Sequence, residues 1–195
     1  MKTWSKASII AVITLLSTVL PVAFVNAHAP VTVTNARVQS ASFSWHIGDD
    51  FLASFNASFG APSVTMADNG DTIEVKGTGT LSIHSKSVTG NGTFVHKLAS
   101  GDEFAHGTWE ATALISFVSY GDASAQGLPS TLFGGMAKIR VNILVDGTVV
   151  HTGILTVFCE LGSRIPHGAH EGIRLVVQDA INFNKQLSGF TVFNQ

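Results

Sequence analysis

The chain has 195 residues, of which 12% are charged, with 11 Lys and Arg against 13 Asp and Glu. This slightly acidic balance, without a basic run, disfavours nucleic acid as a partner. The only cysteine, Cys159, excludes an internal disulfide, so the fold is expected to depend on packing. Cys159 itself lies in an apolar run and is expected to be a small buried side chain.

The beginning of the chain has the pattern of a secretory signal peptide. Lys2 and Lys6 precede a long uncharged apolar run, and Ala27 ends a suitable cleavage site. We therefore expect a signal peptide over residues 1–27 and a single all-β domain over 28–195, in a secreted or extracytoplasmic protein. Residues 28–195 contain nine of the eleven Lys and Arg and all thirteen Asp and Glu, so their formal charge would be −4. Retention of the apolar run as a membrane anchor is the alternative, because it is nearly long enough to span a bilayer.

Alternation of apolar and polar residues recurs along the rest of the chain and predicts strands. No sustained helical pattern follows residue 27. We therefore expect a single antiparallel β-sandwich or closed β-barrel of roughly eight to ten strands, and the sequence leaves the choice between the two open. The strands are expected within residues 71–85, 90–100, 108–121, 137–145, 148–161, 171–180 and 188–193.

The clearest element is a hairpin around Asp146-Gly147. Alternation over 137–145 predicts that Ile139, Val141 and Ile143 share one face, and Asp-Gly is typical of a two-residue hairpin turn. In the strand over 108–121, the same pattern predicts one face that carries Trp109, Ala111, Ala113, Ile115 and Phe117.

Several segments remain open in interpretation. Residues 178–187 fit either a short helix or a strand. Residues 120–136 lack alternation and predict a long loop, which is either a binding segment or a plain crossover. The stretches GTGTLSI and GNGTFVH resemble each other, which chance or hairpin symmetry explains. Asn56 and Asn91 match N-glycosylation acceptors, whose use the sequence does not decide.

Eight histidines are the most unusual feature of so weakly charged a chain. Neutral imidazole is a common ligand of zinc and copper. If residues 100–102 form a three-residue loop, His96 and His106 lie directly opposite each other, with their Cβ atoms roughly 5 Å apart. A loop of two or four residues would send the two rings to opposite faces.

Two further histidine clusters have plain alternatives. His167, His170 and Glu171 share a short loop that either chelates or is simply solvated. His46 stands near Asp49 and Asp50, which either serve as ligands or form the turn after a strand. A Ser-His-Asp site needs placement in three dimensions, and the nucleophile-elbow pattern G-x-S-x-G is absent from the sequence.

Cleavage after Ala27 would make His28 the first residue. Its free amino group and ring nitrogen could then chelate one metal ion, and one more histidine would complete a three-nitrogen set suited to Cu(II). This feature resembles the histidine brace of copper monooxygenases and periplasmic copper-binding proteins. It predicts a copper site at His28, with His96 and His106 as the best candidates for the remaining ligands.

Three functions are compatible with these patterns. The first is an exported all-β binding domain of unknown ligand, with no catalytic activity indicated and with a small molecule, a metal or an extracellular protein as partner. The second is copper binding or copper redox chemistry through His28. The third is a small β-barrel enzyme, of isomerase or cyclase type, or a carrier with an apolar interior cavity lined by residues such as Trp45, Trp109 and Phe117.

Overall fold

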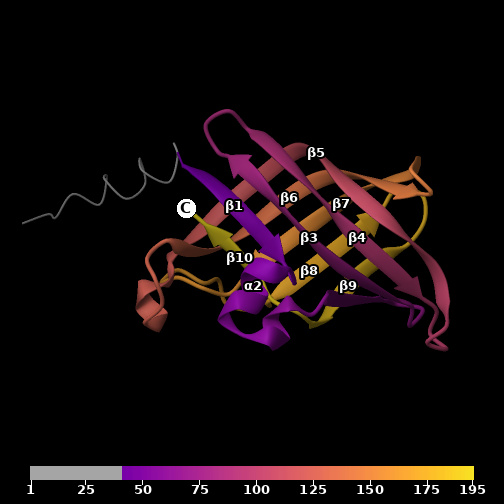
Figure 1. The fold of residues 1–195 in the computed structure, drawn as a ribbon, viewed down its shortest axis with the longest axis horizontal. Helices are drawn as coiled ribbons and strands as arrows, with labels where there is room; N and C mark the ends of the chain where they lie inside the picture. The colour runs from indigo at the N-terminus through magenta and orange to yellow at the C-terminus, as the bar shows by residue number, and fades with distance from the viewer. Residues whose placement is uncertain (1–40) are drawn as a thin grey trace, which may run out of the picture. The chain divides into compact units, whose positions relative to one another are not determined.

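The computed structural model describes residues 41–195, which contain ten strands in one antiparallel sheet and three short helical segments (Figure 1). The expected signal peptide, residues 1–27, and His28 lie outside the described residues. Among residues 41–195, no helix is long and apolar enough to span a membrane. The elements are β1 (Ser42–Ile47), α2 (Asp50–Phe55), η1 (Ala57–Gly60), β2 (Ser63–Ala67), β3 (Thr72–Ser82), β4 (Ser87–Lys97), β5 (Glu103–Asp122), η2 (Ala123–Gln126), β6 (Leu132–Val145), β7 (Thr148–Cys159), β8 (Gly172–Val177), β9 (Asn182–Ser188) and β10 (Thr191–Asn194).

The strand pairings return to their starting point. From β2 they run in chain order through β3 to β9, and β9 pairs again with β2. β1 and β10 form a second path, in which β1 pairs with β3, and β10 joins β1 to β6. Each of the ten strands within residues 41–195 therefore has partners on both sides, which leaves no strand as a free sheet edge. The prediction of an all-β fold is confirmed.

The hairpin around Asp146-Gly147 is confirmed. β6 and β7 flank these two residues, whose φ angles of +49° and +75° are those of a tight hairpin turn. Ile139, Val141 and Ile143 are buried on one face, as the alternation predicts.

The side chains of β5 that face the core are not all those that the alternation predicts. Register shifts between Ala111 and Ala113 and between Leu114 and Ser116 mark two bulges against β6. Each bulge inserts one residue and so exchanges the two faces of the strand. Leu114 consequently packs against the core, whereas Ile115 is 48% exposed, which makes its predicted inward position wrong.

The structure defines the secondary structure of two segments that the sequence left open. Residues 182–188 form the strand β9, in which Phe183 alone is fully buried. The predicted loop over 120–136 is shorter, because β5 continues to Asp122 and β6 begins at Leu132. Both Leu132 and Phe133 are buried in the core, so they are not an exposed binding tip. Cys159 is a buried free thiol, as predicted, and burial raises its pKa well above the ordinary value.

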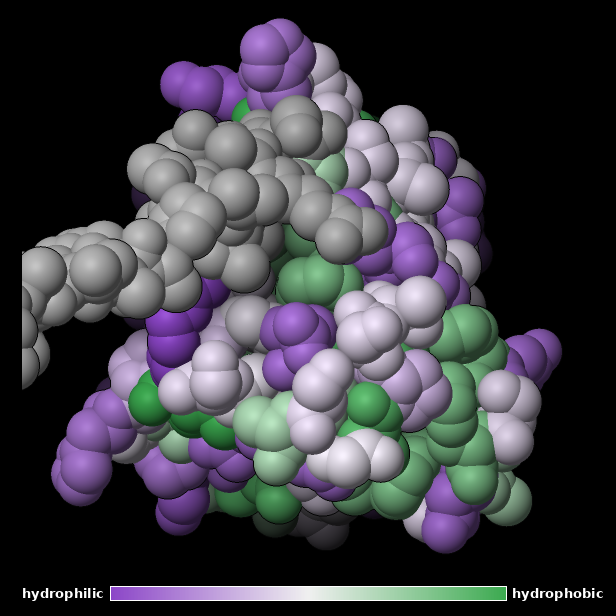
Figure 2. All heavy atoms as spheres, turned by 90° about the vertical axis from the view of Figure 1, so that its left-hand side faces the viewer, coloured by the Kyte–Doolittle hydropathy of each residue, from purple (hydrophilic) through white to green (hydrophobic). Residues whose placement is uncertain are grey.

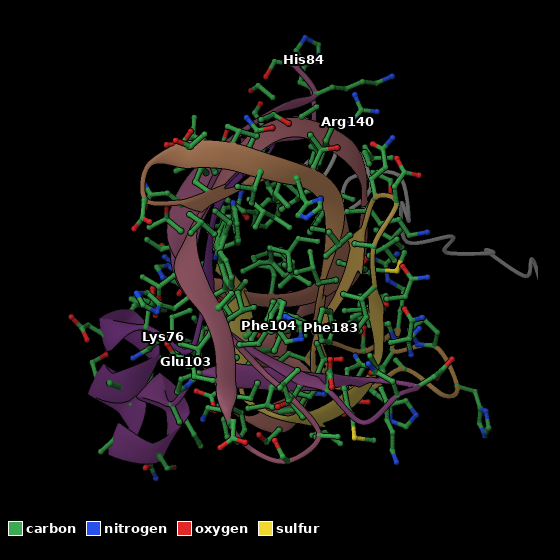
Figure 3. All side chains as sticks on the ribbon, turned by 90° about the vertical axis from the view of Figure 1, so that its right-hand side faces the viewer. Lys76, His84, Glu103, Phe104, Arg140 and Phe183 are labelled. Atoms are coloured by element: carbon green, nitrogen blue, oxygen red, sulfur yellow. The ribbon has the colours of Figure 1, made fainter. Side chains whose placement is uncertain are left out.

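Apolar side chains fill the space that the strands enclose (Figure 3). The largest of them, Trp45, is completely buried, and Trp109 is 3% exposed. Both tryptophans therefore belong to the packed core. At one end of the enclosed space, however, the packing gives way to a cavity.

Candidate functional site

An apolar cavity lies at one end of the strand circuit, the end that carries the β4–β5, β6–β7 and β8–β9 turns. Its volume is about 260 Å³, just under the lower end of the ~300–1,000 Å³ that ligand pockets usually occupy. We call it the mouth pocket. Its lining residues are Ile73, Phe94, His96, Phe104, Ala105, Ile143, Val145, Val150, His151, Val177, Ala180, Ile181 and Phe183.

Two β-bulges shape the rim of the mouth pocket. In β5, Ala105 pairs with His96 and Glu103 pairs with Lys97, so Phe104 is the extra residue. In β7, His151 pairs with Ile143 and Val149 pairs with Leu144, so Val150 is the extra residue. Bulges bend a strand and re-aim its side chains. Here they place two apolar side chains at the opening, where Phe104 is 66% and Val150 is 47% exposed.

The floor of the mouth pocket is tightly packed. Phe94 and Ile143 line both this cavity and a much smaller void of about 10 Å³ beneath it. Trp109 and Leu155 close that void from below. A ligand could therefore occupy the mouth of the enclosed space but not its centre.

One polar side chain, His96, is held firmly at the wall of the pocket. Its ring makes edge contacts with Phe104 and Phe183, at centroid distances of 5.0 and 5.2 Å. Figure 3 labels both phenylalanines. Its Nε2 lies 3.2 Å from Oδ2 of Asp71. The His96 side chain is 14% exposed.

Asp71 joins His96 to the neighbouring turns. Its Oδ1 accepts a hydrogen bond of 3.0 Å from the Ala99 amide, in the turn between β4 and β5. Desolvation raises the pKa of Asp71, but hydrogen bonds from Asn69, His96 and Ala99 outweigh it and hold the pKa below the ordinary value. The carboxylate is therefore ionised at neutral pH and fixes the orientation of the His96 ring.

The structure does not bring His96 and His106 together. His96 is opposite Ala105, and His106 is opposite Val95. The expected register is wrong because residues 98–102 form a five-residue turn and the bulge at Phe104 adds one more residue. Neighbouring positions of a strand face opposite ways, so His106 is 73% exposed beside Glu103 while His96 faces inward.

The predicted copper site therefore cannot use His96 and His106 as a preorganised pair. Within residues 41–195, no group of three or more His, Cys, Asp or Glu side chains could hold a metal ion. His28 lies outside the described residues, so a copper site at the amino terminus stays a prediction. In the cluster of His167, His170 and Glu171, both histidines are exposed, and the Glu171 carboxylate accepts hydrogen bonds of 2.7 Å from the Glu160 and Thr191 amides.

Sequence reasoning missed most of the pocket. It singled out His96, but for a metal, and it placed Trp45 and Trp109 rather than Phe104 and Phe183 at a cavity. Alternation could mark Phe183 as buried, but no pattern in the sequence reveals the two bulges that aim the rim side chains.

Comparisons with known proteins found no relative of this chain. The chain matches no protein-family model, no curated protein and no solved structure. The mouth pocket is therefore interpreted from its own geometry.

Proposed function

We propose that this protein binds a small, mainly apolar ligand in the mouth pocket and acts as an exported carrier or binding protein. The observation that supports this most strongly is the cavity of about 260 Å³, whose lining is apolar except for His96 and His151. The closed circuit of strand pairings supports a β-barrel architecture, and small barrels commonly hold one ligand inside.

The size of the cavity limits the ligand. An apolar cavity of about 150 Å³ is enough to hold benzene, so a cavity of about 260 Å³ suits roughly ten heavy atoms, by proportion to that case. A bicyclic aromatic molecule or the end of a medium-length alkyl chain fits this description. A longer chain would extend past Phe104 and Val150 into solvent.

The wall chemistry sets the orientation. The floor around Phe94 and Ile143 offers only hydrocarbon, while His96 and the exposed His151 lie nearer the rim. An apolar part of the ligand would thus enter first, and a polar group would remain near the histidines. For about ten buried atoms, we expect a dissociation constant in the micromolar range, corresponding to roughly −7 kcal/mol.

The test is fluorescence titration with 1-N-phenylnaphthylamine, a probe that emits strongly when it leaves water. Its ten-carbon naphthyl ring matches the size of the cavity, while its phenylamino group would extend past Phe104 and Val150. Ala105→Phe places a ring in the cavity and is expected to weaken binding at least tenfold. His106→Phe is the matched control, because it adds the same ring one residue further along β5 but on the outer face. Equal binding by both variants and the wild type would refute the mouth pocket as the site.

Export is a separate part of the proposal and depends on residues 1–27. The charged start and the apolar run of that segment support it. Mass spectrometry of the protein recovered outside the cytoplasm is expected to show His28 as its first residue. Recovery of only the full-length chain in the cytoplasm would refute export.

A further inference from the structure

Ser44 and His46, on the outer face of β1, form a hydrogen-bonded line with Asp49, the N-cap of α2. Oγ of Ser44 lies 3.2 Å from Nε2 of His46, and Nδ1 of His46 lies 2.6 Å from Oδ2 of Asp49. None of the three lines the mouth pocket. A nucleophile within hydrogen-bond reach of a base, which a third group orients, is the geometric signature of an activated serine.

The surroundings of His46 fix which nitrogen carries the proton. Thr78 Oγ1 donates to the Trp45 carbonyl at 3.1 Å, so it can only accept from His46 Nδ1, which is 3.2 Å away. Because the Asp49 carboxylate also accepts, Nδ1 carries the hydrogen. The lone pair of the neutral ring is then on Nε2, which faces Ser44 as a general base must.

Packing and capping hold the base and the acid in place. The ring of Phe51 stacks on His46 at 4.1 Å between centroids, with 19° between the planes. Asp49 is also the N-cap of α2, because its Oδ1 accepts from the Leu52 amide at 3.2 Å. With side chains that are 12% and 17% exposed, His46 and Asp49 are sheltered but reachable.

An apolar surface lies next to this line of residues. Phe51 packs edge to face against Phe55, which is 52% exposed. Phe59 and Phe190 form a second aromatic pair, 4.2 Å apart, and the Phe190 carbonyl accepts from the Gly48 amide. Figure 2 shows an apolar area on the side of the molecule where α2 lies. Exposed aromatic surface of this kind favours an apolar or aromatic group on a substrate.

Polar groups flank Ser44 on both neighbouring strands. Thr80 of β3 and Asn194 of β10 are directly opposite Ser44. Directly opposed side chains share a face of the sheet. The Asn194 side-chain amide is therefore placed to donate to an oxygen that becomes negative beside Ser44. The Thr80 hydroxyl can donate as well when Thr89 Oγ1, 2.8 Å away, is the donor of the bond between these two hydroxyls. The Ser44 hydroxyl has a competing acceptor in the Asn194 carbonyl, at 3.3 Å.

From this geometry we infer a second activity, independent of the mouth pocket: Ser44, His46 and Asp49 hydrolyse carboxylic esters that carry an apolar acyl group. Ser44 Oγ attacks the acyl carbon while its proton passes to His46 Nε2. The carbon–oxygen bond to the alcohol then breaks, and the alcohol leaves with that proton. Water attacks the acyl-serine in the same way, which releases the acid and restores Ser44. The products are one acid and one alcohol for each ester and water consumed.

The first experiment is labelling of the full chain with a fluorophosphonate, which reacts with activated serines. Peptide mass spectrometry is expected to find the adduct on Ser44 and not on Ser42, which lies two residues earlier on the same face of β1. His46→Gln is expected to abolish the adduct. An unlabelled wild-type protein, or equal labelling of Ser42 and Ser44, would overturn the proposal.

The second experiment measures hydrolysis of 4-nitrophenyl butyrate. Ser44→Ala is expected to lower kcat/KM by about 100-fold or more, whereas Ser42→Ala is expected to leave it unchanged. Asp49→Ser separates catalysis from folding, because serine still caps α2 but cannot pair with His46. We expect it to keep the melting temperature within a few degrees and to lose at least tenfold in kcat/KM. A Ser44→Ala variant that hydrolyses the ester as fast as the wild type would contradict the proposal.

Discussion

The rings of Trp45 and Trp109 stack inside the strand circuit, with centroids 5.6 Å apart and 26° between the ring planes. Glycines make the room for them. A Cβ added at Gly77 would overlap Cζ2 of Trp109, and one added at Gly90 would lie 2.5 Å from Cζ2 of Trp45. The two largest core side chains therefore occupy space that any other residue at these glycine positions would fill.

This stack predicts a large cost for one methyl group. Gly77→Ala is expected to lower the free energy of unfolding by about 2–3 kcal/mol, because overpacking a tight core typically costs ~1–3 kcal/mol. Urea denaturation measures the change. In a Trp109→Phe background the ring atom that clashes is gone, so the cost of Gly77→Ala should fall by about 1 kcal/mol. An equal loss of unfolding free energy in both backgrounds would show that contact with the Trp109 ring is not the cause.

The same glycines explain the two similar stretches in the sequence. Gly77 pairs with Gly92, and Gly79 pairs with Gly90, across the β3–β4 ladder. Hairpin symmetry was one of the two explanations that the sequence allowed. Three of these four glycines have a tryptophan ring where a Cβ would lie, whereas a Cβ at Gly92 would meet only backbone atoms. Composition alone shows many glycines, but which of them face a tryptophan depends on the register.

The parts of the fold that sequence could predict are local. Alternation over 137–145 and the Asp146-Gly147 turn depend only on neighbouring residues, and both are confirmed. The return of β9 to β2 joins residues more than a hundred positions apart, which no local pattern contains. The expected register of β4 against β5 is wrong because residues 98–102 form a five-residue turn and because one bulged residue, Phe104, reverses the faces.

The turn at Gly147 gives a second prediction. Its φ of +75° is left-handed, and an L-residue pays about 1–2 kcal/mol there. Gly147→Ala should lower the free energy of unfolding by about 1 kcal/mol, while Gly147→Asn should cost less, because asparagine tolerates this conformation. Equal costs for the two variants in urea denaturation would show that backbone strain is not the cause.

Glu171 gives the stability a dependence on pH. Burial raises its pKa from 4.5 to about 7, although hydrogen bonds from the Glu160 and Thr191 amides and the Thr191 hydroxyl act in the opposite direction. Because the folded-state pKa is raised, its stabilising contribution is complete below pH 4.5 and is lost as the pH rises to about 7.

The measurement is the unfolding free energy at pH 4.5 and at pH 8 for the wild type and Glu171→Gln. We expect the wild type to lose up to about 3 kcal/mol more than the variant over this interval. Glutamine carries no titratable proton, so its own stability should lack this component. Parallel pH profiles for the two proteins would rule out Glu171 as the source.

Asp71 supports the wall of the mouth pocket. Asp71→Ala removes the partner of both His96 Nε2 and the Ala99 amide and should lower the melting temperature. It should also release the His96 ring and weaken binding of the naphthylamine probe. Thermal unfolding and titration measure the two effects. Loss of stability with unaltered probe affinity would show that the orientation of His96 does not matter to the ligand.

Methyl NMR of isoleucine-labelled protein shows directly whether a ligand occupies the mouth pocket. Ile73, Ile143 and Ile181 line the cavity, whereas Ile115 lies on the outside of β5. On addition of 1-N-phenylnaphthylamine, we expect saturable shifts of the methyl signals of the three pocket isoleucines and no shift of the Ile115 signal. Shifts at Ile115 with the pocket methyls unmoved would place the ligand on the outer surface and contradict the proposal.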